Sequence, residues 1–399
     1  MNIIFLTMNK FTDLEMHNIY SDLMKEFIRH GHRPYIVTPR EKKEGERTEL
    51  INYPEYSILK VQTGNTSNVS LIEKGISTVT FGEIFYRAVK KELGHLKVDL
   101  ILYSTPPITL ATPVARLKKL FRCQTYLMLK DIFPQNAVDL GMFSKNSPIY
   151  HYFRHVEKKL YRVSDQIGCM SPANVRYCSQ HNPDIPRERI GLCPNAIIAN
   201  PLTDRSESRR KLRETYSVPE GAKVYIYGGN LGKPQGIPFM IDCLRELKDR
   251  KDCFFIICGE GSEYSAVHQF IQEQKPGNVR LISYLPKEEY DQMVQGCDVG
   301  LVFLDHRFTI PNYPSRILSY MEYGMPVLVS SDVNTDVGVE AEQHGYGYWC
   351  ESSCTKEFIQ AMDRINDADI QKMGAASRAH LEAHFKAEYC YNAIMGENT

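Results

Sequence analysis

Residues 223–236 read KVYIYGGNLGKPQG, a short apolar run that passes directly into a loop with four glycines. The run Lys223–Tyr227 is rich in β-branched and aromatic residues and predicts a buried strand. A helical pattern, Ile237–Arg250, follows the loop. A strand, a glycine-rich turn and a helix in this order are typical of an α/β fold with parallel strands.

The alternation of apolar runs and helical patterns extends in both directions from this stretch, which predicts parallel sheets covered by helices. Toward the C-terminus the predicted strands and helices are Phe254–Cys258, Ser262–Gln274 (helix), Val279–Ser283, Lys287–Gly296 (helix), Val299–Phe303, Ser315–Tyr323 (helix) and Pro326–Ser330. Toward the N-terminus they are Ile3–Thr7, Met16–His30 (helix), Pro34–Thr38, Leu100–Ser104, Thr125–Lys130, Pro148–Val163 (helix) and Gln166–Met170.

The composition changes near residue 200, where Asn195–Ser208 is polar and has no apolar period, as in a connection between domains. We therefore predict two Rossmann-like halves, residues 1–200 and 201–375, that face each other across a cleft. Ligands of open α/β sheets bind beyond the carboxyl ends of the strands, so we expect the site in the loops that follow them. The stretch Ile370–Tyr391 is predicted to be helical throughout.

Composition excludes several classes of protein. The chain has 399 residues, of which 43% are apolar, so it can bury a core. Lys+Arg and Asp+Glu both total 48, which argues against a nucleic-acid partner. The cysteines include no Cys-x-x-Cys pair, which indicates reduced thiols in a cytoplasmic protein. No stretch resembles a signal peptide or a membrane span, so we expect a soluble protein or one held at a membrane surface.

Glycine-rich loops follow the first two predicted strands of the second half. Glycines let a backbone approach a ligand and aim N–H groups at an anion. Each loop alone is often only a tight turn, and the fingerprint G-x-G-x-x-G is absent, but two such loops favour a nucleoside diphosphate site. The candidate residues are Gly229, Asn230, Gly232, Lys233 and Gly236 in the first loop and Gly259 and Gly261 in the second.

A cation begins the helix after the fourth predicted strand of this half. The run Asn312–Arg316 reads NYPSR, which places Ser315 where it can cap the helix and Arg316 in the first turn. Because the helix dipole disfavours a cation at that end, Arg316 suits an anionic ligand such as a diphosphate. The alternative is an exposed arginine without a ligand.

These segments together resemble the nucleotide-binding domain of GT-B glycosyltransferases of family 4, of the type that assembles bacterial capsule, lipopolysaccharide and exopolysaccharide. The first half is similar to the acceptor domain of that family, through LKDIFP at 129–134 and Glu157. The motifs in the second half are GNLGKPQG at 229–236, CGEGS at 258–262, PSR at 314–316, YMEYGMPV at 320–327 and GYG at 345–347.

The resemblance implies the GT-B fold, with residues 1–200 as an N-terminal acceptor-side domain, 201–375 as the nucleotide-sugar-binding domain and 376–399 as a C-terminal helix that returns to the first. It implies a retaining transfer, without a metal ion, of a hexosyl or N-acetylhexosaminyl unit from a nucleotide sugar, with UDP as the expected nucleotide. The nucleotide sugar is a co-substrate, so no cofactor is expected. The expected acceptor is a cell-envelope glycan or a lipid-linked sugar at the inner face of the membrane.

One departure from that family concerns the donor contacts. Many members carry two glutamates eight positions apart, of which the later one bonds the donor ribose; here these positions are Pro311 and Ser319. Ser319 can still bond a hydroxyl, although more weakly than a carboxylate, and Glu322 lies one turn along the same helix as a substitute. Without a metal ion the leaving diphosphate needs cations, for which Arg316 and Lys233 are the candidates.

In the first half, Asp131 follows a predicted strand and is the candidate that orients or deprotonates the acceptor hydroxyl. A turn or helix-cap role is its alternative. The predicted helix Pro148–Val163 mixes aromatic and cationic residues, which suits contact with an anionic membrane. Such a helix more often packs its aromatic residues on a sheet, so the sequence leaves membrane contact open.

Three other functions fit parts of the sequence. A nucleotide-sugar 2-epimerase would share the fold and need no separate acceptor. A catalytically inactive nucleotide-sugar-binding protein would explain the missing glutamates. A nicotinamide-dependent dehydrogenase is disfavoured by the missing G-x-G-x-x-G and by glycines in the wrong half.

Overall fold

The computed structural model describes residues 1–65 and 71–396, which form two compact units. Unit 1 comprises Met1–Ile198 and Ala387–Thr399, and unit 2 comprises Ala199–Lys386. The division lies close to the predicted residue 200, whereas residues 376–386, predicted to return to the first domain, lie in unit 2. Residues 397–399 of that predicted return segment lie outside the described residues.

Unit 1 is built on a largely parallel sheet. In its described part, eight strands pair in the order β3-β4-β2-β1-β5-β6-β7-β8, and β3 is antiparallel to β4. The strands are β1 (Asn2–Leu6), β2 (Arg33–Glu41), β3 (Glu49–Asn52), β4 (Ser57–Thr63), β5 (Leu100–Ser104), β6 (Gln124–Leu129), β7 (Gln166–Cys169) and β8 (Ile190–Leu192). The α-helices are α1 (Ile19–Arg29), α2 (Leu71–Leu93), α3 (Ala111–Phe121), α4 (Gln135–Asp139), α5 (Pro148–Val163), α6 (Pro172–His181) and α15 (Ala387–Met395).

Unit 2 has the strand order of a dinucleotide-binding fold. Within residues 199–386, six parallel strands pair in the order β11-β10-β9-β12-β13-β14. The strands are β9 (Lys223–Gly228), β10 (Cys253–Cys258), β11 (Val279–Ile282), β12 (Val299–Phe303), β13 (Val327–Ser331) and β14 (Gly347–Glu351). The α-helices are α7 (Ser206–Tyr216), α8 (Ile237–Leu247), α9 (Tyr264–Gln274), α10 (Lys287–Gly296), α11 (Arg316–Glu322), α12 (Val337–Gln343), α13 (Thr355–Asp367) and α14 (Ile370–His384).

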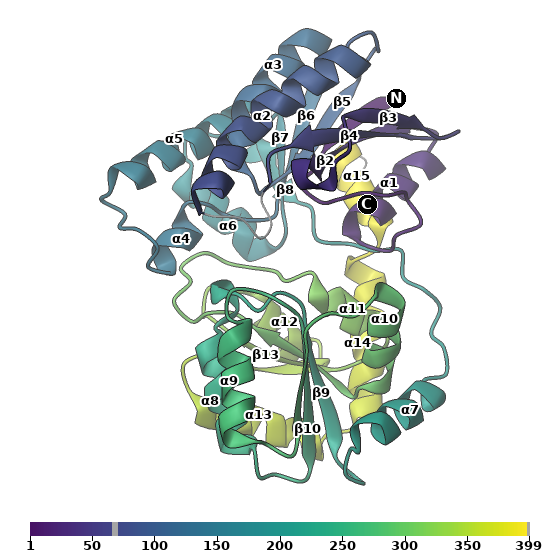
Figure 1. Cartoon of the computed structure of the whole chain (residues 1–399), viewed down its shortest axis with the longest axis vertical. Helices are drawn as coiled ribbons and strands as arrows, with labels where there is room; N and C mark the ends of the chain where they lie inside the picture. Colours follow the sequence, from purple (N-terminus) through teal and green to yellow (C-terminus); the bar gives the residue numbers. More distant parts are fainter. Residues whose placement is uncertain (66–70, 397–399) are drawn as a thin grey trace. The chain divides into compact units, whose positions relative to one another are not determined.

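Helices cover both faces of the unit 2 sheet (Figure 1). Because side chains alternate along a strand, Tyr225 and Tyr227 of β9 lie on one face, in a buried cluster with residues of α8, α9 and α13. On the other face, α11 lies against β12, where a Cβ on Gly300 would come within 2.2 Å of the Tyr320 ring. The close approach of α11 to the sheet therefore depends on the absence of a side chain at Gly300.

The predicted helix Ile370–Tyr391 is wrong as one element, because the chain forms α14 and α15 with a break at Phe385 and Lys386. The Phe385 ring packs against Tyr313 of unit 2, with ring centroids 5.6 Å apart. The N–H of Ala387 donates to the carbonyl of Ile197 in unit 1, at 3.0 Å. These tertiary contacts interrupt a segment whose local pattern is helical.

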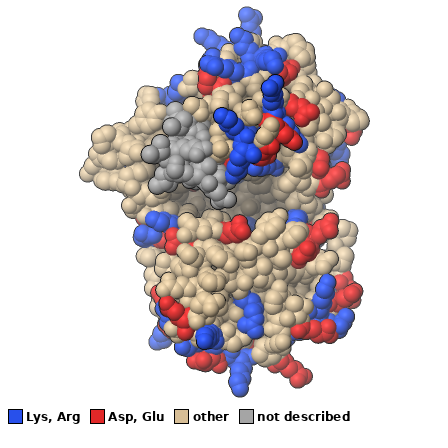
Figure 2. Space-filling model, in the orientation of Figure 1, with Lys and Arg blue, Asp and Glu red and all other residues tan. Residues whose placement is uncertain are grey.

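The surface charge and the hydropathy of the helices are as the amino-acid composition leads us to expect. Figure 2 shows basic and acidic side chains close to one another on the visible face of each unit, as expected when both total 48. In residues 1–65 and 71–396, no helix is both long enough and apolar enough to cross a membrane.

Candidate functional site

The candidate site of unit 2 lies where the strand order reverses, between β9 and β12. Open α/β sheets bind ligands at this point, beyond the carboxyl ends of the strands. The loops that follow the two strands are in contact, because the N–H of Asp305 donates to the carbonyl of Pro234 at 3.0 Å. A Cβ on Gly236 would come within 3.3 Å of the Asp305 Cα.

The two predicted glycine loops pack backbone against backbone. The N–H of Gly229 donates to the carbonyl of Cys258 at 2.9 Å, and that of Leu231 donates to Glu260 at 2.8 Å. A Cβ on Gly259 would lie 1.8 Å from the carbonyl oxygen of Gly229, a distance that no side chain can occupy. A glycine at position 259 is therefore required for the loops to meet.

The amides of the first loop are largely engaged inside the protein, which differs from the expectation that they face an anion. Besides Gly229 and Leu231, the N–H of Gly228 donates to the hydroxyl oxygen of Tyr320 at 3.1 Å, and that of Gly232 donates to Gln235 at 3.2 Å. The side-chain amide of Asn230 also donates to the Gln235 side-chain oxygen, at 3.0 Å. The glycines thus shape the loop more than they present donors to a ligand.

Arg316 is the first residue of α11, and its guanidinium lies beside this loop. Its Cζ atom is 4.4 Å from the centroid of the Tyr227 ring, and a Cβ on Gly229 would come within 3.2 Å of it. Nη1 is buried and has no hydrogen-bond partner among the described residues. Because an arginine stays protonated and its unpaired N–H groups are costly to bury, this atom suits an anionic ligand.

Three tyrosines surround Arg316, a feature that the sequence did not predict. They are Tyr227, Tyr290 and Tyr320, and burial raises the pKa of each phenol above its ordinary value. The hydroxyl of Tyr290 lies so close to Gly228 that a Cβ there would be 1.8 Å away. The tyrosines therefore remain neutral beside the guanidinium. They come from β9, α10 and α11, so no local sequence pattern joins them.

The other residues predicted to bind the sugar donor lie in the first loop and on α11. Lys233 is exposed on the turn before α8. Ser315 directly precedes α11, but its side chain does not cap the helix, which corrects the predicted capping role. Ser319 lies four residues after Ser315 and so on the same side of α11. Its side chain is half-buried.

Glu322 is buried at the end of α11, where its carboxylate is engaged by the start of unit 2. Its Oε1 atom accepts from the backbone N–H of Asn200 at 2.8 Å and from the Asn200 side-chain amide at 3.0 Å. The structure therefore gives Glu322 an internal hydrogen-bond role, whereas Ser319 keeps the position at which a ribose contact was predicted.

In unit 1, Asp131 follows β6 in a turn held by two side chains. The hydroxyl oxygen of Thr105 accepts from the N–H of Asp131 at 3.1 Å. The amide of Asn136 donates to both carboxylate oxygens, at 2.8 and 3.0 Å. Burial raises the pKa of Asp131 to about 6, and hydrogen bonds from the Ile132 N–H and the Asn136 amide oppose the rise. A carboxyl that titrates near neutrality can accept a proton from a substrate hydroxyl.

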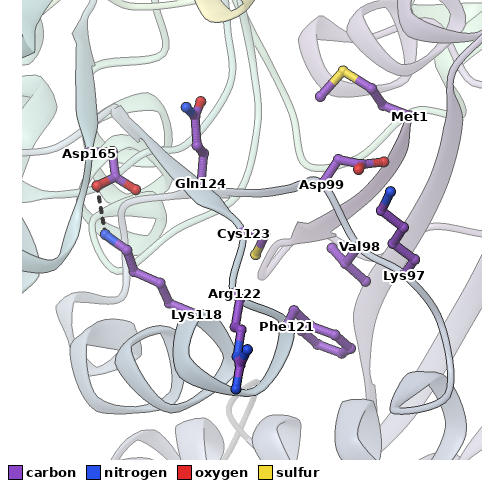
Figure 3. A pocket seen from close by; sticks show the side chains of 10 residues that line it. All are labelled: Met1, Lys97, Val98, Asp99, Lys118, Phe121, Arg122, Cys123, Gln124 and Asp165. Carbon is purple, nitrogen blue, oxygen red and sulfur yellow. Dashed lines mark hydrogen bonds and ion pairs between the residues drawn. The ribbon is translucent and has the colours of Figure 1, made fainter.

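A cavity of about 660 Å³ opens at the other end of the unit 1 sheet (Figure 3). It is lined by residues that precede β1, β5, β6 and β7, among them Asp99, Cys123 and Asp165. The carboxylate of Asp165 pairs with Lys118 at 2.6 Å across its wall. Because it lies at the amino ends of the strands, it is not where this fold binds its ligands.

Comparison with known proteins relates this architecture to sugar transfer. Residues 208–379 match the family described as Glycosyl transferases group 1. The chain is 22% identical over 325 residues to a Pseudomonas aeruginosa protein described as probable glycosyltransferase WbjE, covering 80% of this chain and 78% of that protein.

Two solved structures are similar over both units. Sucrose-phosphate synthase from Thermosynechococcus elongatus has a TM-score of 0.75 and 16% identity, covering 99% of this chain and 98% of that one. Anabaena Alr3699/HepE, solved with UDP and glucose, has a TM-score of 0.69 and 16% identity over the same shares. The matched family domain contains both glycine loops and Arg316. The chain is therefore a glycosyltransferase with the GT-B fold, and residues 208–379 of its second unit match the glycosyl transferases group 1 family.

Proposed function

We propose that this glycosyltransferase moves a hexosyl or N-acetylhexosaminyl unit from a UDP-sugar to a cell-envelope glycan or a lipid-linked acceptor. We propose further that the transfer retains the anomeric configuration and needs no metal ion. The order of the motifs supports a family 4 enzyme of capsule, lipopolysaccharide or exopolysaccharide assembly. A second relative, WcaI of Escherichia coli, is described as a colanic acid biosynthesis glycosyl transferase, which agrees with that type of acceptor.

The observation that carries the proposal is the buried Nη1 atom of Arg316, which has no hydrogen-bond partner among the described residues. A diphosphate oxygen would supply the missing acceptor and neutralise the charge. The absence of a side chain at Gly229 lets the adjoining loop lie against the guanidinium, and Lys233 on its exposed turn can add a second cation. The solved Anabaena relative contains UDP, which supports UDP as the nucleotide.

In the proposed reaction, the bond between the anomeric carbon and the β-phosphate oxygen breaks, and the acceptor oxygen forms the new glycosidic bond. The electron pair stays on the diphosphate, where Arg316 stabilises the developing charge. Asp131 orients the acceptor hydroxyl and takes its proton. Ser319 bonds the donor ribose. The products are UDP, the extended glycan and a protonated carboxyl.

The acceptor would be met at the cytoplasmic face of the membrane. Unit 1 exposes Met142, Ile149 and Tyr152 near the start of α5, and their exposed fractions are 64%, 47% and 57%. Lys145 lies exposed between them in the sequence. Apolar side chains next to a cation suit shallow contact with an anionic bilayer, and sedimentation with anionic vesicles measures this contact.

The first test is the binding of UDP, measured by calorimetry. Replacing Arg316 by Ala should weaken UDP binding about 10- to 150-fold, corresponding to the roughly 1.5–3 kcal/mol of a hydrogen bond to a charged group. Arg210→Ala, a change of an exposed arginine on α7, is the matched control and should leave affinity unchanged. Equal affinity of wild type and Arg316→Ala would refute the donor site.

The second test is the reaction itself, followed with UDP-sugars, a panel of glycan acceptors and a chelator. We expect a glycosylated product whose yield is unchanged by the chelator. Loss of activity with the chelator, and its return with Mn²⁺, would overturn the metal-free proposal. Conversion of the UDP-sugar into its epimer, with no glycosylated product, would instead support a 2-epimerase.

A further inference from the structure

The C-terminal end of α11, the helix that begins with Arg316, is hydrogen-bonded to α14. The Nη1 atom of Arg378 donates to the carbonyl of Glu322, the last residue of α11, at 2.8 Å. Arg378 is itself held by Glu382, whose Oε1 atom accepts from its Nε at 2.7 Å. The end of α11 therefore has a fixed place against α14.

A second set of contacts fastens the segment that leads into α11. Tyr313 is buried three residues before Arg316, and its hydroxyl donates to the Oε2 atom of Glu340 at 2.7 Å. The other carboxylate oxygen of Glu340 lies 3.0 Å from Nε2 of His380 on α14. Although burial opposes it, the bonds from His380 and Tyr313 hold the pKa of Glu340 below its ordinary value. The carboxylate is thus a charged acceptor for both.

The rings around this chain of hydrogen bonds leave Tyr313 little freedom. Phe385 lies 5.6 Å from the Tyr313 ring between centroids, and Tyr346 lies 4.9 Å from the His380 ring. Three other titratable groups lie near Glu340 and His380. They are His344 and Asp336, at the two ends of α12, and His384 on α14. The cluster joins the loop before α11 to two other helices.

Only two residues separate Tyr313 from Arg316. The N–H of Ile317 donates to the carbonyl of Pro314 at 3.3 Å, and that of Leu318 donates to Ser315 at 3.1 Å, so the helical turn begins directly after Tyr313. A displacement of the Tyr313 side chain would therefore move the start of α11. The guanidinium of Arg316 would then shift relative to the Tyr227 ring over which it lies.

We propose that Tyr313, Glu340 and His380 are positioning residues for the diphosphate site, because their hydrogen bonds set the place of the Arg316 guanidinium. This inference rests on the proposed function, in which Arg316 binds the diphosphate of the donor. None of the three residues touches the ligand. They act through the start of α11, so their effect on UDP binding requires Arg316.

The experiment is a double-mutant cycle on UDP affinity, measured by calorimetry. Tyr313→Phe keeps the ring and removes the hydroxyl, and should weaken UDP binding about 3- to 10-fold. In the Arg316→Ala background the same change should have no further effect, because residues that act as one unit are not additive. A purely structural loss of stability would reduce binding equally in both backgrounds.

A second pair of variants tests Glu340, which accepts the hydrogen bond from the Tyr313 hydroxyl. Glu340→Gln keeps an oxygen for the Tyr313 hydroxyl and should bind UDP more tightly than Glu340→Ala. Tyr225→Phe is the matched control: it also removes a buried tyrosine hydroxyl of unit 2, which donates to Asn366 at 2.7 Å, but at the start of β9. Its UDP affinity should equal that of wild type.

The outcomes separate this inference from the proposed function. If wild-type protein does not bind UDP, both fail. If it binds and Arg316→Ala weakens binding, the donor site stands. Wild-type affinity in Tyr313→Phe and in Glu340→Ala would then overturn the inference alone, and so would an equal effect of Tyr313→Phe in both backgrounds. If Tyr313→Phe does not fold, the Glu340 variants decide between these outcomes in the same cycle.

Discussion

The surroundings of Asp131 give its carboxyl a higher pKa than an aspartate has in water. Burial raises its pKa to about 6, whereas the Asn136 amide donates to both oxygens and favours the charged form. The two influences act in opposite directions, so the residue can be ionised at neutral pH and still accept a proton. The sequence identified Asp131 by its place after a strand, but not Asn136, whose role depends on the shape of the turn.

The acid limb of the activity profile should follow this carboxyl. Activity should fall as the pH drops through about 6, because the protonated Asp131 can no longer take a proton. Asn136→Ala removes the side-chain hydrogen bonds that lower the pKa of Asp131, so the limb should move to higher pH. Gln135→Ala changes the neighbouring amide, which donates to Asp139, and is the control. An unchanged limb of kcat/KM in Asn136→Ala would contradict the assignment.

At the scale of elements, the two glycine loops form one structure, since backbone hydrogen bonds join them. Their meeting could be predicted, because they follow neighbouring parallel strands. Their hydrogen bonds could not be predicted from composition: the same glycines that could have presented amides to a ligand use them to bind the adjoining loop. The ligand-binding part of the site therefore rests on Arg316.

Gly259→Ala should separate this packing from the general effect of losing a glycine. The added Cβ would meet the Gly229 carbonyl, so we expect a loss of about 1–3 kcal/mol in the free energy of unfolding, and loss of UDP binding. Gly277→Ala is the control, because its Cβ meets nothing within 4 Å. Chemical denaturation and calorimetry measure both. A Gly259→Ala protein as stable as wild type would show that the loops do not need this contact.

Most strands and helices of unit 2 follow from hydropathy, since buried parallel strands are short apolar runs. The edge strands β3, β8 and β14 were missed because their burial is partial, so no continuous apolar run marks them. The interior strand β4 was also missed, because polar residues interrupt its apolar run. The contacts of Tyr313 with Glu340 and His380 were also missed. They join three segments that are distant in the sequence, and only the tertiary structure brings such residues together.

At the scale of the molecule, α15 completes unit 1 although it follows unit 2 in the sequence. Tyr391 is buried with its ring 5.1 Å from Phe27 and 4.0 Å from His30, between centroids. Its hydroxyl lies 3.0 Å from Nε2 of His32. One helix from the C-terminus thus covers part of the core built around α1.

Tyr391→Ala should therefore weaken unit 1 and spare unit 2. We expect a loss of about 3–5 kcal/mol in the free energy of unfolding of unit 1, as for other large aromatic side chains removed from a core. UDP affinity should not change, because the donor site lies in unit 2. Scanning calorimetry with and without UDP distinguishes the units, since UDP raises only the transition of the unit it binds.

Tyr389→Ala, a change of a half-buried residue of the same helix, is the control for Tyr391→Ala. A Tyr391→Ala protein that lost UDP affinity and kept its unit 1 transition would contradict the assignment of α15 to unit 1.

The order of the chain has a bearing on how the protein is made. A ribosome produces residues 199–386 between the two parts of unit 1, which takes roughly 10–40 s at about 5–20 residues per second. During that time the apolar side chains of α1 that will contact Tyr391 have no permanent cover. The nascent first unit stays incomplete until α15 is translated, and this interval is when it is most exposed to chaperones and to aggregation.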